Sequence, residues 1–203
     1  SAYSQLYSTN AGAKTVLSGI IKKNTEIDGI VFKANSRVQI LENGYVISGQ
    51  LAENTEIDGI LYAAESLIQF YSNDGAVYSG TLAEDYVIDN MFFEDNTEVA
   101  YYEEGELLSG DLKTNTSINS IRFSSESPIE FHSNGKIKSG FIAEPLTYKS
   151  VEYPAGTGFK FYRSGNPSAA ILIEDTTING ITYSGTNESL PDNYCITFHE
   201  QGR

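Results

Sequence analysis

The chain has 203 residues and a formal net charge of −14 at pH 7, with only 13 Lys and Arg residues. Nucleic acids are bound by clustered basic side chains that displace counterions, and anionic membrane surfaces attract the same groups, so this charge argues against both partners. The one cysteine excludes a disulfide framework within this sequence. No stretch approaches the ~18 apolar residues of a transmembrane helix, so membrane insertion is not expected.

A period close to thirty residues runs through the whole sequence. Ser-Gly pairs set its phase, and their spacings are 30, 31, 30, 30 and 30 when a degenerate sixth pair is included: Ser18-Gly19, Ser48-Gly49, Ser79-Gly80, Ser109-Gly110, Ser139-Gly140 and Ala169-Ala170. The one extra residue falls in a turn at 72–75. Self-similarity at this period predicts stacked modules, and no boundary breaks the phase, so a single repeat domain over residues 1–203 is expected.

The two ends depart from the repeat, as the ends of a stack should. Residues 1–19 are interpreted as an N-terminal half repeat or cap, residues 20–183 as the repeats, and residues 184–203 as an irregular loop with a C-terminal cap. The largest insertion runs from Ser184 to Cys195. The first residue is Ser rather than Met, so we expect a processed N-terminus and an exported protein that is secreted, periplasmic or on the cell surface, with a lipid anchor as one form of that processing.

Each module is predicted to hold two or three short strands, because short runs of alternating apolar residues are separated by Asn, Asp, Gly and Ser. The alternation slips at Asp58-Gly59 and again at Ser79-Gly80, and such a slip at glycine marks a bulge or a corner. The steps Asn43-Gly44, Asp74-Gly75 and Asn134-Gly135 fit two-residue hairpin turns with positive φ at both positions. Pro145 and Pro154 should lie at an edge or in loops.

Apolar residues recur at about seven positions of the module and are predicted to form a continuous, thin core. The columns begin at Ile21, Ile27, Ile30, Phe32, Val38, Ile40 and Val46 and recur at thirty-residue intervals. The chain is therefore predicted to be all-β, an elongated solenoid-like stack of about six β-hairpin repeats. A closed six-bladed β-propeller is the alternative, although thirty residues are few for a four-stranded blade.

Two segments carry a resemblance to a known family. Residues 70–80 (FYSNDGAVYSG) and 131–140 (FHSNGKIKSG) resemble the YY-x-NG-K-L-x-S hairpins of MORN-variant repeat proteins of bacteria. The match covers roughly a third of each unit. The resemblance implies extended sheets that serve as scaffolds or contact surfaces for proteins or lipids, and it carries over no binding residues.

Catalytic and metal motifs are scarce. His132 and His199 are the two histidines, and no Ser or Cys has a His and a carboxylate at a recognisable motif spacing. Zinc-type spacings are absent, and no cofactor is expected. Asp28, Asp58 and Asp89 recur one module apart and offer a calcium alternative, since calcium takes six to eight oxygen ligands. Asx turns explain the same column equally well.

The better candidate is a row of aromatic residues predicted to point outward, because each follows an inward column and strand side chains alternate. These residues are Tyr71, Tyr102, His132, Tyr162 and His199. Such a row stacks on sugar rings or forms a protein contact patch, or else braces the sheet. We expect a non-enzymatic scaffold or adhesin-like module that binds a protein or glycan surface. The alternative is a carbohydrate-active enzyme that uses carboxylates between Tyr148 and Cys195.

Overall fold

The structure is a computed structural model that describes residues 7–11, 14–125, 127–178, 180–185 and 195–200. These residues form strands, turns and bends, with no helix among them, so the described part of the chain has none that could cross a membrane. The chain divides into two units, which are described separately below. The first comprises Ser1–Ile88 and Phe93–Leu107, and the second comprises Asp89–Phe92 and Leu108–Arg203.

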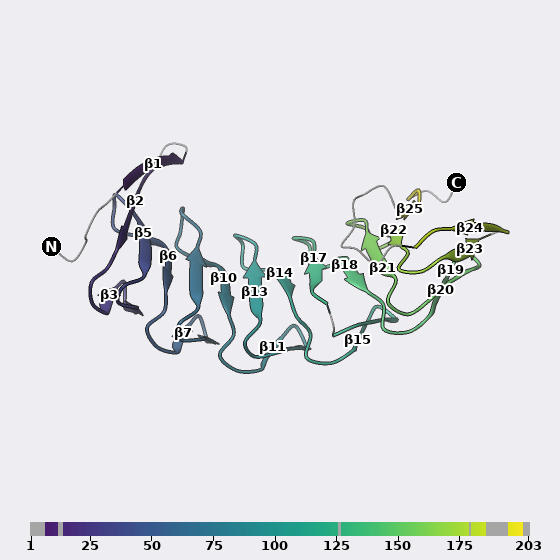
Figure 1. Ribbon diagram of the computed structural model, residues 1–203, viewed down its shortest axis with the longest axis horizontal. Coiled ribbons are helices and arrows are strands. Elements are labelled where there is room, and N and C mark those ends of the chain that lie inside the picture. The colour runs from purple at the N-terminus through teal and green to yellow at the C-terminus, as the bar shows by residue number, and fades with distance from the viewer. Residues whose placement is uncertain (1–6, 12–13, 126, 179, 186–194, 201–203) are drawn as a thin grey trace. The chain divides into compact units, whose positions relative to one another are not determined.

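In the first unit, an antiparallel sheet has the strand order β1-β2-β5-β6-β9-β10-β13. Small hairpins lie at one end of these strands, where Figure 1 labels β3 and β7. The sheet strands are β1 (Tyr7–Ala11), β2 (Lys14–Ile20), β5 (Arg37–Leu41), β6 (Val46–Gln50), β9 (Leu67–Phe70), β10 (Val77–Thr81) and β13 (Glu98–Tyr101). The remaining strands are β3 (Thr25–Ile27), β4 (Ile30–Phe32), β7 (Thr55–Ile57), β8 (Ile60–Tyr62) and β11 (Tyr86–Ile88). β12 (Met91–Phe93) and β14 (Leu107–Gly110) contain residues of both units.

The second unit repeats this pattern, with the sheet order β14-β17-β18-β21-β22-β25. Its sheet strands after β14 are β17 (Ile129–Phe131), β18 (Ile137–Phe141), β21 (Gly158–Phe161), β22 (Pro167–Ile171) and β25 (Cys195–Thr197). Its small hairpins are β15 (Thr116–Ile118) with β16 (Ile121–Phe123), β19 (Leu146–Tyr148) with β20 (Val151–Tyr153), and β23 (Thr176–Ile178) with β24 (Ile181–Tyr183).

The predicted all-β stack of hairpin repeats is confirmed in each unit. A typical module contributes two strands to the sheet and two to a small hairpin, so the prediction of two or three strands was wrong. Successive sheet hairpins are hydrogen-bonded to each other, as Gly49 pairs with Ile68 between β6 and β9. A propeller would keep each blade as a separate sheet, so the six-bladed alternative is wrong.

The step Asp58-Gly59 is a two-residue hairpin turn rather than a bulge or an open corner. Asp58 has φ 52° and Gly59 has φ 80°, and the flanking Ile57 and Ile60 are directly paired. Positive φ at both central residues is the requirement of a type I′ turn. The apparent slip in the alternation therefore arises because the chain reverses there. Asp28-Gly29 has the same geometry one module earlier.

The Asn-Gly steps form longer loops than predicted. Gly44 N–H donates to the carbonyl of Leu41 at 2.9 Å, and Leu41 N–H donates to the carbonyl of Tyr45 at 2.8 Å. Of the pair Asn43-Gly44, Gly44 alone has positive φ, which is the three-residue loop with a type I turn and a bulge.

The two-residue prediction was wrong at the other steps as well. Asn134-Gly135 has the hydrogen bonds of the loop at Asn43-Gly44, and Asp74-Gly75 belongs to a loop one residue longer. In that loop, Tyr71 N–H donates to the carbonyl of Ala76 at 2.8 Å. The extra residue of the third module is therefore located at 72–75, as predicted. The bulge expected near Ser79-Gly80 is confirmed by a register shift between Val77 and Ser79.

Five of the seven predicted core columns are buried, and they lie between the sheet and the small hairpins. The columns that begin at Ile27 and Ile30 are mostly half-buried, because both flank the exposed two-residue turns. In the aromatic column, Phe32, Tyr62, Phe93, Phe123 and Tyr153 are buried, whereas Tyr183 in the last small hairpin is 40% exposed. The last small hairpin therefore does not extend the aromatic column of the core.

In the first unit, the serine of the Ser-Gly pair is buried and bonds across the sheet. Ser48 Oγ donates to Gln39 Oε1 at 2.8 Å, and Ser79 Oγ donates to Gln69 Oε1 at 3.0 Å. These bonds give the buried serine hydroxyls a partner, and an unpaired polar atom there would be costly.

The structure describes the irregular segments in part. β1 and β2 form a hairpin that precedes β5, and β25 pairs with β22. Pro145 precedes β19 and Pro154 follows β20, so both are outside strands. Most of the insertion from Ser184 to Cys195 lies outside the described residues.

Candidate functional site

Two grooves in the first unit lie between the tips of small hairpins and the loops of sheet hairpins. The first groove, of about 500 Å³, is lined by Asp28, Ile30, Tyr45, Val46, Ile57, Asp58, Phe70, Asp74 and Gly75. The second groove, of about 230 Å³, is lined by Asp58, Ile60, Tyr62, Ala76, Val77, Tyr101 and Gly105. Both form because type I′ turns hold the aspartates at the hairpin tips, opposite the loops that join the sheet strands.

The two grooves are repeats of one site. Five lining residues of the first groove have a counterpart one module later that lines the second groove. The pairs are Asp28 and Asp58, Ile30 and Ile60, Val46 and Val77, Phe70 and Tyr101, and Gly75 and Gly105. Val46 and Val77 begin β6 and β10, which are two strands apart in the sheet. Neighbouring strands lie about 4.8 Å apart, so equivalent sites recur about every 10 Å.

The first groove is larger and more polar at its rim. Tyr45 occupies the position that Ala76 takes in the second groove, and its side chain is 56% exposed. Asp74 comes from the longer loop at 72–75 and adds a third carboxylate to those of Asp28 and Asp58. The Oδ1 atom of Asp74 accepts a hydrogen bond from Ala76 N–H at 3.0 Å, which orders this loop.

The second groove contains two buried phenols. The pKa of Tyr62 is raised mainly by burial and further by the neighbouring Tyr101 and Asp58. Burial also raises the pKa of Tyr101, to about 12. Both hydroxyls are therefore protonated near neutral pH. The Tyr62 and Tyr101 hydroxyls lie close enough that a side-chain hydrogen bond between them affects both pKa values, although no described residue meets the buried Oη atom of Tyr101 at full hydrogen-bond geometry.

The sequence pointed to these side chains without assigning them to a site. Tyr62 and Tyr101 were placed in apolar columns, where the neighbouring modules have Phe32, Phe93, Phe70 and Phe131. A tyrosine in a column of phenylalanines signals a hydroxyl that needs a polar neighbour. That signal was missed.

The predicted aromatic row lies along the loops of the sheet hairpins, and its polar atoms face the next module. Tyr71 Oη donates to the carbonyl of Tyr101 at 2.8 Å, His132 Nε2 lies 2.9 Å from the carbonyl of Phe161, and Tyr162 Oη donates to the carbonyl of Phe198 at 2.7 Å. Tyr71, Tyr102, His132 and Tyr162 are half-buried, and His199 is exposed. This geometry favours the bracing interpretation of the row.

The aspartate column has a conformational explanation. Asp28 and Asp58 have φ of 54° and 52°, and Asp89 has φ of 51°, a region that Asp and Asn tolerate better than most residues. Among the described residues, no group of three His, Cys, Asp or Glu side chains is arranged to hold a metal ion. The first two aspartates instead line the grooves.

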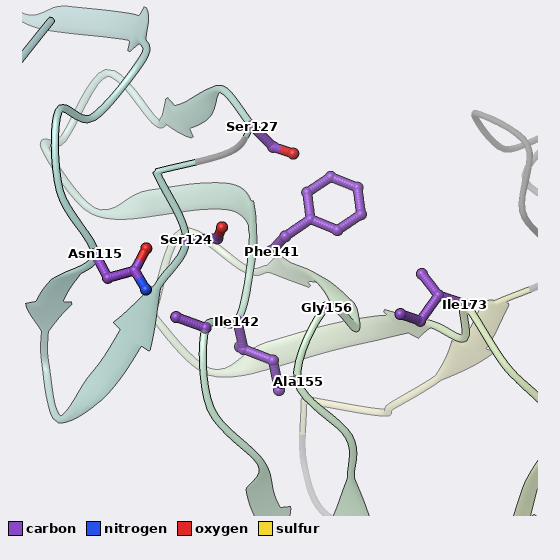
Figure 2. Close-up of a pocket in the computed structure, with 9 residues that line it drawn as sticks. Asn115, Ser124, Ser127, Phe141, Ile142, Ala155, Gly156 and Ile173 are labelled. Atoms are coloured by element: carbon purple, nitrogen blue, oxygen red, sulfur yellow. The ribbon is translucent and has the colours of Figure 1, made fainter.

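A cavity of about 430 Å³ in the second unit lies where the repeat is irregular. Figure 2 shows Asn115, Ser124 and Ser127 on one side and Ile173 on the other, with Phe141 between them. Among the residues that the structure describes, no charged side chain lines this cavity. Its chemistry differs from that of the two grooves, so it is not a third copy of the site.

Two carboxylates in the second unit have shifted pKa values. Burial raises the pKa of Asp111, whose buried Oδ1 atom has no hydrogen-bond partner among the described residues. Burial also acts to raise the pKa of Glu130, but hydrogen bonds from Ser139 and Lys138, and the charges of Lys138 and Lys160, outweigh it and lower that pKa. Neither residue lines the grooves or the cavity of Figure 2.

Comparisons with known proteins add little. No family model matches the chain, and no curated protein matches it, so the resemblance to MORN-variant repeats stays a prediction. A solved structure of alternansucrase in complex with isomaltononaose is similar over 90% of this chain, at 14% sequence identity and a TM-score of 0.14. The chain spans 16% of the length of that chain. A TM-score this low carries no argument about fold or ligand.

Proposed function

We propose that this chain is a non-enzymatic binding module that is exported and presents a row of repeated grooves to a glycan. The observation that supports this most is the equivalence of the two grooves, which places the same residue types about 10 Å apart along the sheet. A polymer with a regular repeat can occupy such sites together, and the combined affinity then exceeds that of either site alone.

The lining of the grooves suits a sugar. Carboxylates accept hydrogen bonds from hydroxyl groups, and phenols can both donate and accept them. The apolar walls formed by Ile60 and Val77 in the second groove, and by Phe70 in the first, can contact the C–H face of a ring. Ligand sites in proteins commonly combine an apolar wall with a few placed polar groups.

An enzyme is the weaker interpretation. Glycoside cleavage uses two carboxylates in opposite protonation states on either side of the scissile bond. Asp111 and Glu130 have pKa values shifted in opposite directions, but neither lines a groove. The repeated, matching grooves are more consistent with binding at several equal sites than with one reaction centre.

A glycan array tests the proposal. We expect binding to at least one glycan, and we expect Tyr45→Ala and Ala76→Trp to weaken it, because the first removes an exposed wall and the second fills the second groove. Tyr183→Ala is the matched control, since this tyrosine is exposed but lies in the second unit. Loss of binding in Tyr102→Ala and Tyr162→Ala, with no effect of Tyr45→Ala and Ala76→Trp, would assign the site to the aromatic row instead.

A further inference from the structure

The charge of the grooves indicates which glycans they take. Asp28, Asp58 and Asp74 line the first groove and Asp58 also lines the second, whereas none of the Lys, Arg and His residues that the structure describes lines either groove. The whole chain carries a net charge of −14. Clefts lined by one sign of charge concentrate ligands of the opposite sign, because their low-dielectric walls focus the field.

The second groove adds groups that accept hydrogen bonds from a cation. Tyr101 is 8% exposed and lines the groove with Tyr62 and Asp58, and its Oη atom interacts with the Tyr62 hydroxyl without meeting any described residue at full hydrogen-bond geometry. An ammonium group has three donors and no acceptor, so a carboxylate and phenol oxygens can satisfy it. Tyrosine ring faces also attract cations. A neutral hydroxyl would gain the hydrogen bonds but not the attraction to the carboxylates.

We propose that the two grooves bind a glycan whose sugars carry protonated amino groups, that is, a polymer of de-N-acetylated hexosamine. This inference rests on the proposed function, because it names the class of glycan for the same site. Because the grooves are about 10 Å apart, one ligand can fill both only if its amino groups recur about every 10 Å, or every 10 Å divided by a whole number.

The test compares two oligosaccharides that differ only in N-acetylation, which removes each amino charge and adds an acetyl group, and the variants described below separate these two effects. Isothermal titration calorimetry is carried out with a β-1,4-linked glucosamine hexamer and with its fully N-acetylated counterpart, at a pH where the free amino groups are protonated. We expect the glucosamine hexamer to bind at least about tenfold more tightly. We also expect its affinity to fall as salt is added and as the pH rises through the pKa of the amino groups.

Matched variants assign the effect to the groove. Asp58→Asn should weaken binding of the glucosamine hexamer about tenfold or more and leave binding of the N-acetylated hexamer unchanged. Glu56→Gln removes one charge from the same small hairpin at an exposed position outside the grooves, and it should change neither affinity. Circular dichroism confirms that both variants fold.

The outcomes separate this inference from the proposed function. Equal or tighter binding of the N-acetylated hexamer, with no effect of Asp58→Asn, would overturn the inference while the glycan-binding function stands. Loss of affinity in Glu56→Gln equal to that in Asp58→Asn would also overturn it, because net charge rather than the groove would then explain the binding. Failure of both hexamers, and of every array glycan, to bind would overturn both proposals.

Discussion

The ring of Phe32 occupies the space that a side chain on Gly49 would need. A Cβ atom at Gly49 would lie 2.4 Å from Cδ1 and 2.7 Å from Cε1 of Phe32. Phe32 ends the small hairpin of one module and Gly49 lies in the sheet strand β6 that follows it. The Ser-Gly repeat therefore reflects a contact between the small hairpin and the sheet, in which an aromatic ring packs directly on the backbone. Gly140 and Phe123 make the same contact in the second unit.

The first prediction is that Gly49→Ala destabilises the protein. The added methyl group must displace a buried ring in a packed core, and overpacking of this kind costs about 1–3 kcal/mol. We expect the free energy of unfolding to fall by about 2 kcal/mol in urea denaturation followed by circular dichroism.

A double-mutant cycle shows whether the ring is responsible. Phe32→Leu alone leaves a cavity and is destabilising, but in combination with Gly49→Ala it provides room for the new methyl group. The double variant should therefore lose at least about 0.5 kcal/mol less unfolding free energy than the sum of the losses in the two single variants. Strict additivity would mean that Gly49 is required for another reason.

The second prediction concerns type I′ turns that lack glycine. Ser150 has φ 63° and follows Lys149, which has φ 50°. The left-handed conformation costs a residue with a Cβ atom about 1–2 kcal/mol, and glycine avoids this cost. Glycine also gives the unfolded chain more conformational entropy, which cancels about 0.5–1 kcal/mol of that stabilisation. Ser150→Gly should therefore stabilise the protein by about 0.5 kcal/mol, measured by urea denaturation.

Ser117→Gly is the control for this prediction. Ser117 lies in the middle of β15, where its backbone is extended, so glycine there offers no relief of strain and weakens the strand. We expect a loss of stability at Ser117 and a gain at Ser150. A loss at both positions would mean that the chain entropy of glycine outweighs the strain that it relieves at Ser150.

The sequence was sufficient to predict the core but not the turns. Recurrence at thirty residues identified buried columns such as that of Phe32, because equal positions in a stack meet equal packing demands. Both Asp58-Gly59 and Asn43-Gly44 suit turns with positive φ, and only the pairing register distinguishes them. Ile57 pairs with Ile60, so the loop between them has two residues, whereas Leu41 bonds to Tyr45, so that loop has three residues.

The grooves could not be predicted from the periodicity. The sequence identified the column of Asp28 and Asp58 and the column of Phe70 and Tyr101 as separate features. They meet in one groove because the small hairpin folds back toward the loops of the sheet. That proximity depends on how the chain bends at Leu51 and at its equivalents, and no local pattern encodes the bend.

The third prediction is that the aromatic row stabilises the stack rather than binding the ligand. Tyr162→Phe removes the hydrogen bond from Tyr162 Oη to the carbonyl of Phe198 and leaves the ring in place. We expect the free energy of unfolding to fall by about 1 kcal/mol and glycan affinity to stay the same. Tyr45→Phe is the control, since this exposed side chain should not affect stability. Unchanged stability in Tyr162→Phe would contradict the bracing role.

The fourth prediction is that Asp111→Asn stabilises the protein at neutral pH. Burial raises the pKa of Asp111 above its unfolded value, so the native state binds more protons than the unfolded state between these two pKa values. The contribution of Asp111 to stability therefore falls as the pH rises through this window. We expect the variant to unfold at higher urea than the parent at neutral pH, with the difference shrinking as the pH is lowered. A difference that is constant with pH would show that the charge of Asp111 is not the cause.

The fifth prediction has the opposite sign and concerns Glu130. Its pKa is lowered, because the hydrogen bond from Ser139 Oγ at 2.8 Å and the ion pair with Lys138 Nζ at 3.1 Å outweigh the effect of burial. Its contribution to stability is therefore fully present above the unfolded pKa and is lost as the pH falls through the folded pKa.

Glu130→Gln should accordingly be less stable than the parent at neutral pH and equal to it in acid. The loss should be less than about 1 kcal/mol, since the ion pair with Lys138 is half-exposed. Glutamine can still accept the bond from Ser139, as Gln39 and Gln69 do from Ser48 and Ser79 in the first unit. Urea denaturation at a series of pH values, with Asp111→Asn measured in parallel, checks both signs. A difference from the parent that grows in acid would contradict the assigned direction of the Glu130 pKa.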